Sequence, residues 1–328
     1  MPAYAGYLGL NALTGQTRGW LMGQGHCVAA IDALNLLKGN LHPEQAERYA
    51  DGAEGVNRLL SDFYGYAQAA DGSAEAPLGS HVNPHTAGGI AKGGYLRFAE
   101  LQYARLPLPG ETLVAFLSDG AAEEQRVSDW IPCWWRAEDC GVALTVMIAN
   151  GRRIEQRIEM GTHTAVEGFA RHLRSCGFDP LIFNGRDPAA FVCALWEMEQ
   201  RLAHREHEMH IGILQYPLPI PYAIAETLKG FGFYGAGSNA AHNLPLPGNP
   251  HNDAEARALF NQYASPLWVP PVELAAARQL FAQYCEGRVL ERDNPLAVRR
   301  PPAPQLPALT YRMDKCSPMA ALDGFLSI

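Results

Sequence analysis

The residues TLVAFLSDG at positions 112–120 and VALTVMIANG at positions 142–151 decide the fold of this chain. Each is a short apolar run that is typical of a buried parallel strand, and each stops at a turn dipeptide, Asp-Gly or Asn-Gly. A polar segment that bears tryptophans, roughly Ala122 to Glu138, lies between them and has room for one helix. The pattern therefore predicts a strand–helix–strand unit of an open α/β sheet.

Asp119 and Asn150 stand where the two predicted strands end. The strands of such a unit are parallel, so both residues fall at the carboxyl edge of the sheet, where open α/β sheets bind their ligands. Carboxylate and amide oxygens suit Mg²⁺ beside a diphosphate. Either turn by itself is explained equally well as a plain loop. Their separation by one helix and one strand favours a common site.

The composition argues against several classes of protein. A net charge of −8 without a basic stripe makes nucleic acid a poor candidate for a partner. No apolar run approaches the roughly 18 residues that a membrane-spanning helix requires, and the first residues lack the pattern of a signal peptide. The seven cysteines include no CxxC pair, so the sequence predicts reduced thiols and a cytoplasmic protein rather than a disulfide framework or a zinc ribbon.

Further apolar patterns extend the sheet on both sides of this unit. Strands are predicted at 19–22, 179–184 and 216–225, and helices at 29–38, 169–177, 188–209, 253–263 and 272–284. Residues 42–72 are predicted to be helical and polar, whereas the first 18 residues show no strong periodicity. With 48% hydrophobic residues in a chain of 328, one large core or two modest ones can form.

These elements predict an α/β protein, with an open parallel sheet flanked by helices in a module of residues 1–255. A helical and Pro-rich extension follows at residues 256–328 and contacts or leads to a partner module. Its proline-rich part, residues 300–307, is expected to be an extended arm, and residues 317–326 are expected to begin another helix.

Three further features have both a functional and a plain structural interpretation. His26 follows a predicted strand at a turn into a helix, where it could face a ligand, although a capping or surface histidine is the commoner outcome. The glycines of residues 77–94 could let backbone N–H groups approach phosphate, yet a flexible loop explains them equally well. Three histidines near the end of the 188–209 helix recur every third residue, a spacing that could bind a metal but more often forms a wet polar face.

Six short motifs, taken in order, resemble the N-terminal, diphosphate-binding half of a phosphoketolase, within the wider transketolase family. GQGH at 23–26 resembles G-P-G-H, SHVNP at 80–84 with TAG at 86–88 resembles S-H-V-A-P-E-T-P-G, and SDGAAE at 118–123 resembles G-D-G-E-A-E. NGRRI at 150–154 resembles N-G-Y-K-I, TLKG at 227–230 resembles T-P-K-G, and HNLPL at 242–246 resembles the last five residues of S-H-Q-V-P-L. The order and the gaps of these motifs make the similarity specific from about Gly23 to His251.

The resemblance implies a thiamine-diphosphate enzyme that transfers a two-carbon ketol unit from a ketose donor. It implies that Mg²⁺ is held by Asp119, Asn150 and the backbone carbonyl of Arg152. It further implies that the cofactor contacts Gly25, Gly88, Gly89, Gly120, Asn150 and Ile154. The implied catalytic groups, which would donate hydrogen bonds and move protons near the reactive carbon of the cofactor, are His26, His81, His242 and Lys229.

The departures from the family motifs concern acid–base groups. Ala91 and Lys92 stand where the family has a histidine and an acidic residue, Ala121 replaces another acidic residue, and Ser118 replaces a glycine. Dehydration and phosphorolysis need more acid–base groups than ketol transfer does. These substitutions therefore argue against the phosphoketolase reaction itself.

Family members also carry a second α/β module, which binds the pyrimidine end of the cofactor. The residues after Pro307 are too few for such a module, so we expect a partner subunit to supply it in a two-fold assembly. The alternative is a non-catalytic relative that binds the cofactor or serves as a scaffold. Retention of Asp119, Asn150 and three histidines at motif positions argues against complete loss of the site.

Overall fold

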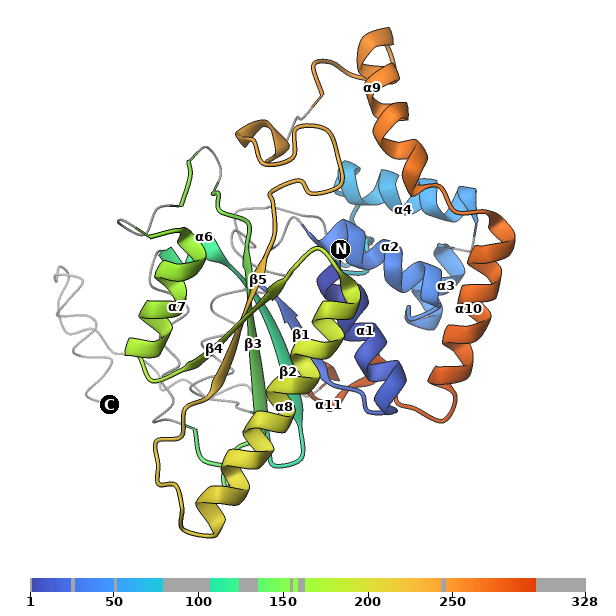
Figure 1. Cartoon of the computed structure of the whole chain (residues 1–328). Helices are drawn as coiled ribbons and strands as arrows, with labels where there is room; N and C mark the ends of the chain where they lie inside the picture. Colours follow the sequence, from blue (N-terminus) through green and yellow to red (C-terminus); the bar gives the residue numbers. More distant parts are fainter. Residues whose placement is uncertain are drawn as a thin grey trace, which may run out of the picture. The chain divides into compact units, whose positions relative to one another are not determined.

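Five parallel strands form one sheet in the order β1-β2-β3-β5-β4 (Figure 1). The computed structural model describes residues 2–24, 27–49, 52–78, 107–123, 135–153, 156–158, 163–242 and 246–298. The strands are β1 (Gly19–Met22), β2 (Thr112–Ser118), β3 (Val142–Ala149), β4 (Asp179–Asn184) and β5 (Pro221–Glu226). The predicted open parallel sheet is confirmed, and β1, β3 and β4 have the predicted bounds.

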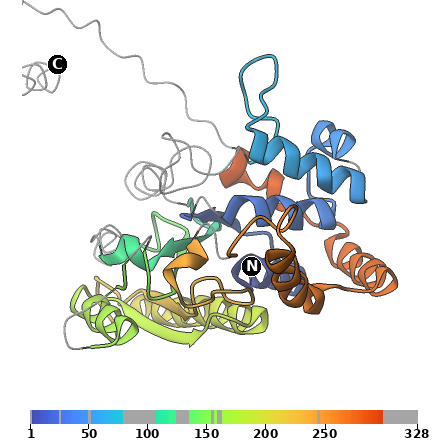
Figure 2. The same cartoon turned by 90° about the horizontal axis from the view of Figure 1, so that it is seen from above.

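Helices cover both faces of this sheet. Those that precede β5 in the chain are α1 (Pro2–Thr14), α2 (Val28–Lys38), α3 (Pro43–Arg48), α4 (Ala53–Gly65), α6 (Asp119–Glu123), α7 (Ala165–Ser175) and α8 (Pro188–His210). On one face, Phe116 and Val146 pack with α1 and α8, whereas on the other face Ala115 and Met147 belong to the core that includes α7. Burial on both faces explains why the strands appear in the sequence as continuous apolar runs. Beyond α1, α4 is stacked on α2 (Figures 1 and 2).

Helix α1 was not predicted from the sequence, and its surroundings give the reason. Most of its side chains are buried, among them Tyr4, Tyr7 and Leu10. Its more exposed face carries small or apolar residues such as Ala5, Gly9 and Leu13, so no polar face produces a helical periodicity. Its contact with α8 is close at Gly6, where an added Cβ would lie 2.4 Å from the Cβ of Phe191. The first helix of the chain is therefore a core element.

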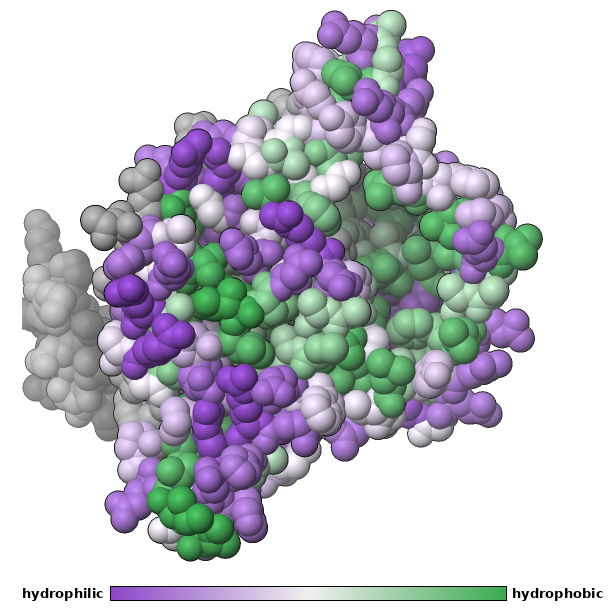
Figure 3. Space-filling model, viewed as in Figure 1, coloured by the Kyte–Doolittle hydropathy of each residue, from purple (hydrophilic) through white to green (hydrophobic). Residues whose placement is uncertain are grey.

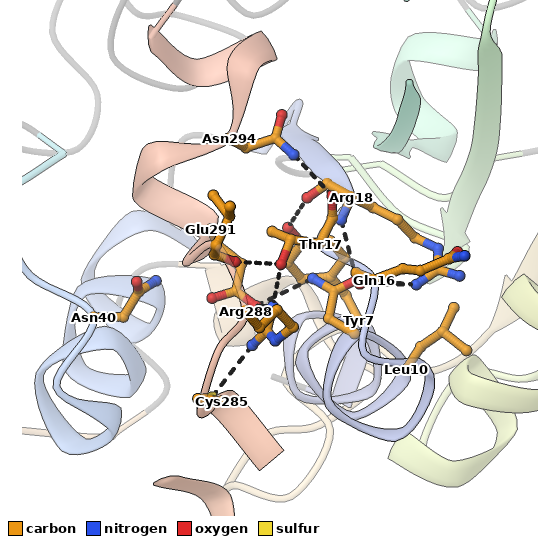
Figure 4. Close-up of polar contacts among 12 residues, drawn as sticks. Tyr7, Leu10, Gln16, Thr17, Arg18, Asn40, Cys285, Arg288, Glu291 and Asn294 are labelled. Atoms are coloured by element: carbon orange, nitrogen blue, oxygen red, sulfur yellow. Dashed lines mark hydrogen bonds and ion pairs between the residues drawn. The ribbon is translucent and has the colours of Figure 1, made fainter. Parts of the chain in front are cut away.

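The segment after β5 ends in further helices, of which α10 contacts both α1 and α2. They are α9 (Ala254–Ala264), η4 (Ser265–Leu267), α10 (Pro271–Cys285), η5 (Glu291–Asp293) and α11 (Pro295–Val298). Glu291, whose side chain is fully buried, forms ion pairs with Lys38 of α2 and Arg288, and accepts a hydrogen bond from the Asn11 side chain of α1. Nearby, Asn294 Nδ2 donates to the carbonyl of Thr17 (Figure 4). Residues 285–294 are thus anchored by buried polar contacts.

Two further predictions need correction. The helix expected from Ala122 to Glu138 is wrong at its end, where residues 135–141 form turns and Trp135 is buried in the core. Its first residues, Ala122 and Glu123, belong to the short helix α6, and residues 124–134 lie outside the described residues. Strand β5 begins at Pro221 rather than at residue 216, because the prolines at 217 and 219 lack the N–H groups of a sheet ladder. The expected features at 300–307 and 317–326, and most of the glycine-rich stretch 77–94, lie outside the described residues.

Helix α8 returns the chain to the amino end of β5. The loop between them exposes Ile211 and Ile213, which are 56% and 66% accessible. Figure 3 shows apolar surface at the lower tip of the molecule, where the loop after α8 lies in the same view. This connection leaves β5 parallel to β3, so both strands end at the opposite edge of the sheet. None of the described helices combines the length and apolar character that crossing a membrane requires.

Candidate functional site at the carboxyl edge of the sheet

Asp119 and Asn150 lie at the carboxyl ends of the adjacent strands β2 and β3. The Asp119 carboxylate accepts hydrogen bonds from the backbone N–H of Gly120 at 2.9 Å and from that of Gly151 at 2.6 Å. These bonds leave further lone pairs on both carboxylate oxygens, since each oxygen can accept more than one partner. The juxtaposition of the two residues expected from the sequence is therefore present.

The environment of Asp119 is unfavourable for an uncompensated charge. The residue is 1% exposed, and burial raises the pKa of its carboxyl group to about 6, although the backbone N–H groups of Gly151, Gly120 and Asn150 oppose the shift. Within the part of the chain that the structure describes, no ion pair to Asp119 is present. A divalent cation at this carboxylate would supply the missing positive charge.

The turn after β3 has a defined shape. Asn150 Oδ1 accepts a hydrogen bond from the backbone N–H of Arg152 at 2.9 Å, which is the closure of an Asx turn. Gly151 has φ +74°, in the left-handed region that favours glycine, and its carbonyl accepts from the N–H of Ile158 at 3.0 Å. The local sequence Asn-Gly therefore fixes the backbone that faces Asp119.

A third loop, residues 227–242 after β5, reaches the same edge. It begins where the Thr227 N–H donates to the Ala149 carbonyl at 3.0 Å, and it ends in the helix η3 (Asn239–His242). Lys229 Nζ donates to the carbonyl of Arg153 at 2.8 Å, and Arg152 Nη1 donates to Asn239 Oδ1 at 2.5 Å. The loops after β3 and β5 thus bind one another reciprocally.

Charges in these loops act on one another. Partial burial and the neighbouring charge of Arg152 lower the pKa of Lys229, while Asp119 opposes that shift. Partial burial and the charge of Lys229 lower the pKa of His242. His242 is consequently a neutral imidazole at neutral pH, able to accept a proton or a hydrogen bond.

The described part of the site contains half of the residues expected from the sequence. Those placed together are Asp119, Gly120, Asn150, Arg152, Lys229 and His242. Those outside the described residues are Gly25, His26, His81, Gly88, Gly89 and Ile154.

Two further residues at this edge were not predicted. Gln24 directly follows the end of β1 and is 7% exposed, and neither polar atom of its side chain has a partner among the described residues. Its sequence signal is that it takes the place of proline in the G-P-G-H motif. Asn239, which holds Arg152, has no recognisable signal in the sequence.

Comparison with known proteins identifies a matching sequence family and similar solved structures for this chain. Residues 13–261, more than half of it, match the family described as the XFP N-terminal domain. The structure of a transketolase variant from Pichia stipitis is similar over 85% of this chain and 38% of the transketolase chain, at 15% identity and a TM-score of 0.44. Transketolase from Leishmania mexicana is similar over 82% of this chain and 39% of the transketolase chain, at 16% identity and a TM-score of 0.37.

Comparison with curated proteins finds no significant match. The chain spans less than two fifths of the length of the transketolases that it matches. The assignment therefore depends on the sequence family. The chain belongs to the phosphoketolase (XFP) N-terminal-domain family.

Proposed function

We propose that this chain binds thiamine diphosphate with Mg²⁺ at the edge where β2, β3 and β5 end. In this proposal it is the diphosphate-binding subunit of a ketol-transferring enzyme, and a partner chain carries the pyrimidine-binding module. The observation that supports it most strongly is the pair of oxygen-bearing residues, Asp119 and Asn150, joined through the 2.6 Å bond from the Gly151 N–H.

The residues present fit a magnesium ion. Asp119 offers a buried carboxylate, Asn150 Oδ1 is a hard amide oxygen, and each retains acceptor capacity after its backbone hydrogen bond. The backbone carbonyl of Arg152 would be the third protein ligand. Occupation by Mg²⁺ would remove the electrostatic cost that raises the pKa of Asp119.

The residues around this centre have roles in substrate binding. When bound, the cofactor supplies the nucleophilic carbon for two-carbon transfer from a ketose donor. His242, neutral at neutral pH, would accept a proton from a substrate hydroxyl, and Lys229 would stabilise negative charge on a substrate oxygen. His26 and His81 are proposed to contribute from the remaining two motifs. Ketol transfer requires fewer acid–base groups than phosphorolysis, which favours it in a chain that carries Ala91.

Calorimetric titration of thiamine diphosphate with Mg²⁺ tests the proposal, using this chain alone and then with a candidate partner subunit. We expect binding that tightens with the partner and is lost in Asp119→Ala. Ketol-transfer activity of the pair would follow. Cofactor binding without activity in any pairing would instead support a non-catalytic relative, and absence of binding under both conditions would overturn the proposal.

A further inference from the structure

The loops above the carboxyl edge carry a positive charge that the proposed magnesium site does not explain. The protein as a whole is acidic, with a net charge of −8. Residues 227–242 nevertheless contain no acidic residue and one lysine, and the turn at 150–153 contains two arginines and no acid. An acidic protein that concentrates positive charge at one edge creates a local field that attracts anions.

Within this region Arg152 and Lys229 are brought close together and held. Arg152 is fixed by its 2.5 Å hydrogen bond to Asn239, and Lys229 by its 2.8 Å bond to the Arg153 carbonyl. The Lys229 carbonyl in turn accepts from the Gly237 N–H at 2.7 Å, which closes the loop that carries both Lys229 and Asn239. Neither cation is therefore free to swing away from the other.

Two held cations repel one another. Partial burial and the charge of Arg152 lower the pKa of the Lys229 ammonium, and the carboxylate of Asp119 opposes that shift. If Asp119 is engaged by a divalent cation, the neighbourhood becomes still more positive. Such an arrangement is stable when an anion with several acceptor oxygens lies between the cations.

We propose that Arg152 and Lys229 form an oxyanion-binding pair for a phosphate group, in which Arg152 is a departure of this chain from its family motif. The motif N-G-Y-K-I has a neutral tyrosine where NGRRI has Arg152. A guanidinium presents a planar fork of donors that matches phosphate oxygens, and one of its donors is already used to fix its direction. The phosphate is either the terminal one of the cofactor diphosphate, a source that rests on the proposed function, or that of a second ligand.

The experiment compares binding of four probes to the full chain by calorimetry. The probes are thiamine diphosphate, thiamine monophosphate and pyrophosphate, each with Mg²⁺, and inorganic phosphate added to protein already saturated with thiamine diphosphate. The variants are Arg152→Gln, Arg152→Lys, and Arg174→Gln as the control. Arg174 is exposed near the end of α7, at the amino edge of the sheet, so its substitution makes the same change in net charge away from the site.

We expect Arg152→Gln to weaken phosphate binding about tenfold, the size of one charge-assisted hydrogen bond, with partial recovery in Arg152→Lys. If Arg152→Gln loses affinity for thiamine diphosphate and pyrophosphate alone, the group bound by Arg152 is the terminal phosphate of the cofactor. If it loses affinity for inorganic phosphate alone, that group belongs to a second ligand. Unchanged binding of every probe in Arg152→Gln, or an equal loss in Arg174→Gln, would overturn the proposal.

The failure of this inference is distinguishable from failure of the proposed function. If wild-type protein binds pyrophosphate in a manner dependent on Arg152 but does not bind thiamine diphosphate, the oxyanion pair stands and the cofactor assignment falls. If thiamine diphosphate binds and requires Asp119 but no probe is sensitive to Arg152, the cofactor assignment stands and the oxyanion pair falls. Thermal unfolding of each variant checks that a lost signal is not lost folding.

Discussion

The Asp119 carboxylate holds the backbone N–H of Gly151 at 2.6 Å, so the end of β2 fixes the turn that follows β3. Gly151 has φ +74°, which a residue with a Cβ adopts only at a cost of about 1 kcal/mol. We expect Gly151→Ala to lower the free energy of unfolding by about that amount in urea titrations. Because the turn also carries Asn150, Gly151→Ala should weaken Mg²⁺-dependent binding of thiamine diphosphate about tenfold.

Gly212→Ala is the matched control for this prediction. Gly212 follows α8 with φ +78°, and an added Cβ there would meet no atom within 4 Å. Gly212→Ala should lower the free energy of unfolding by a similar amount and leave cofactor binding unchanged. Equal effects of the two substitutions on binding would show that the geometry of the Gly151 turn is not what matters.

The close contact of α1 with α8 predicts sensitivity at Gly6. A Cβ at this position would lie 2.4 Å from the Phe191 Cβ and 2.6 Å from the Pro188 carbonyl oxygen, so the two helices would have to separate. We expect Gly6→Ala to lower the free energy of unfolding by about 1–3 kcal/mol, despite the better helix propensity of alanine. Gly9→Ala, where the nearest atom is Val192 Cγ2 at 3.3 Å, should cost much less in the same chemical denaturation experiment.

Strands β1, β2, β3 and β5 could be predicted from the sequence because their burial leaves continuous apolar runs between turn residues, whereas the edge strand β4 is only half-buried but carries an apolar run at residues 181–183. The runs at β3 and β4 have clear borders, Asn-Gly after Ala149 and Gly-Arg after Asn184, and their predicted bounds are those observed. Helix α1 could not be recognised, because its more exposed face is made of small or apolar residues and so lacks the polar stripe on which periodicity depends.

For the site, residue type and position after a strand were sufficient to place Asp119 beside Asn150. The contact between Arg152 and Asn239 joins residues 87 positions apart in the sequence. It depends on the path of the loop after β5, which is set by backbone hydrogen bonds such as that from the Gly237 N–H to the Lys229 carbonyl. Bonds of this kind involve atoms that every residue has, so they leave no pattern in the sequence.

Asp32 in α2 predicts a pH-dependent stability. It is fully buried, its Oδ1 has no partner among the described residues, and burial raises its pKa to about 7, although the Leu78 N–H opposes the shift. Since the folded-state pKa is the higher one, this group's contribution to stability is complete below about pH 4 and is lost as the pH rises toward 7. Asp32→Asn should therefore be more stable than wild type at pH 8, by up to about 4 kcal/mol.

Urea titrations of wild type and Asp32→Asn at pH 4 and pH 8 provide the measurement. The two proteins should differ little at pH 4, where the carboxyl group is protonated in the folded state, and this comparison serves as the internal control. A stability difference that is the same at both pH values would contradict the assignment to the carboxyl group.

The buried carboxylate of Glu291 predicts a large effect in the C-terminal anchor (Figure 4). Glu291→Gln would leave Lys38 and Arg288 without their common counter-ion in a site where all three side chains are almost fully buried. We expect a loss of about 3–5 kcal/mol in the free energy of unfolding, measured by chemical denaturation. Glu286→Gln, an exposed change in the same segment, should have almost no effect. Comparable losses in both variants would mean that the segment, rather than the buried charge, is sensitive.

The contacts of Glu291 also set an order of events during synthesis. It meets Lys38 and Asn11 across sequence separations of 253 and 280 residues. At a translation rate of about 5–20 residues per second, on the order of 10 to 50 seconds pass between the emergence of Lys38 and that of its counter-ion. During that time the Asn11 side chain of α1 stays hydrated, although it is buried in the folded protein. Helix α1, which is made before the segment that carries Glu291, thus reaches its final packing only after that segment has emerged.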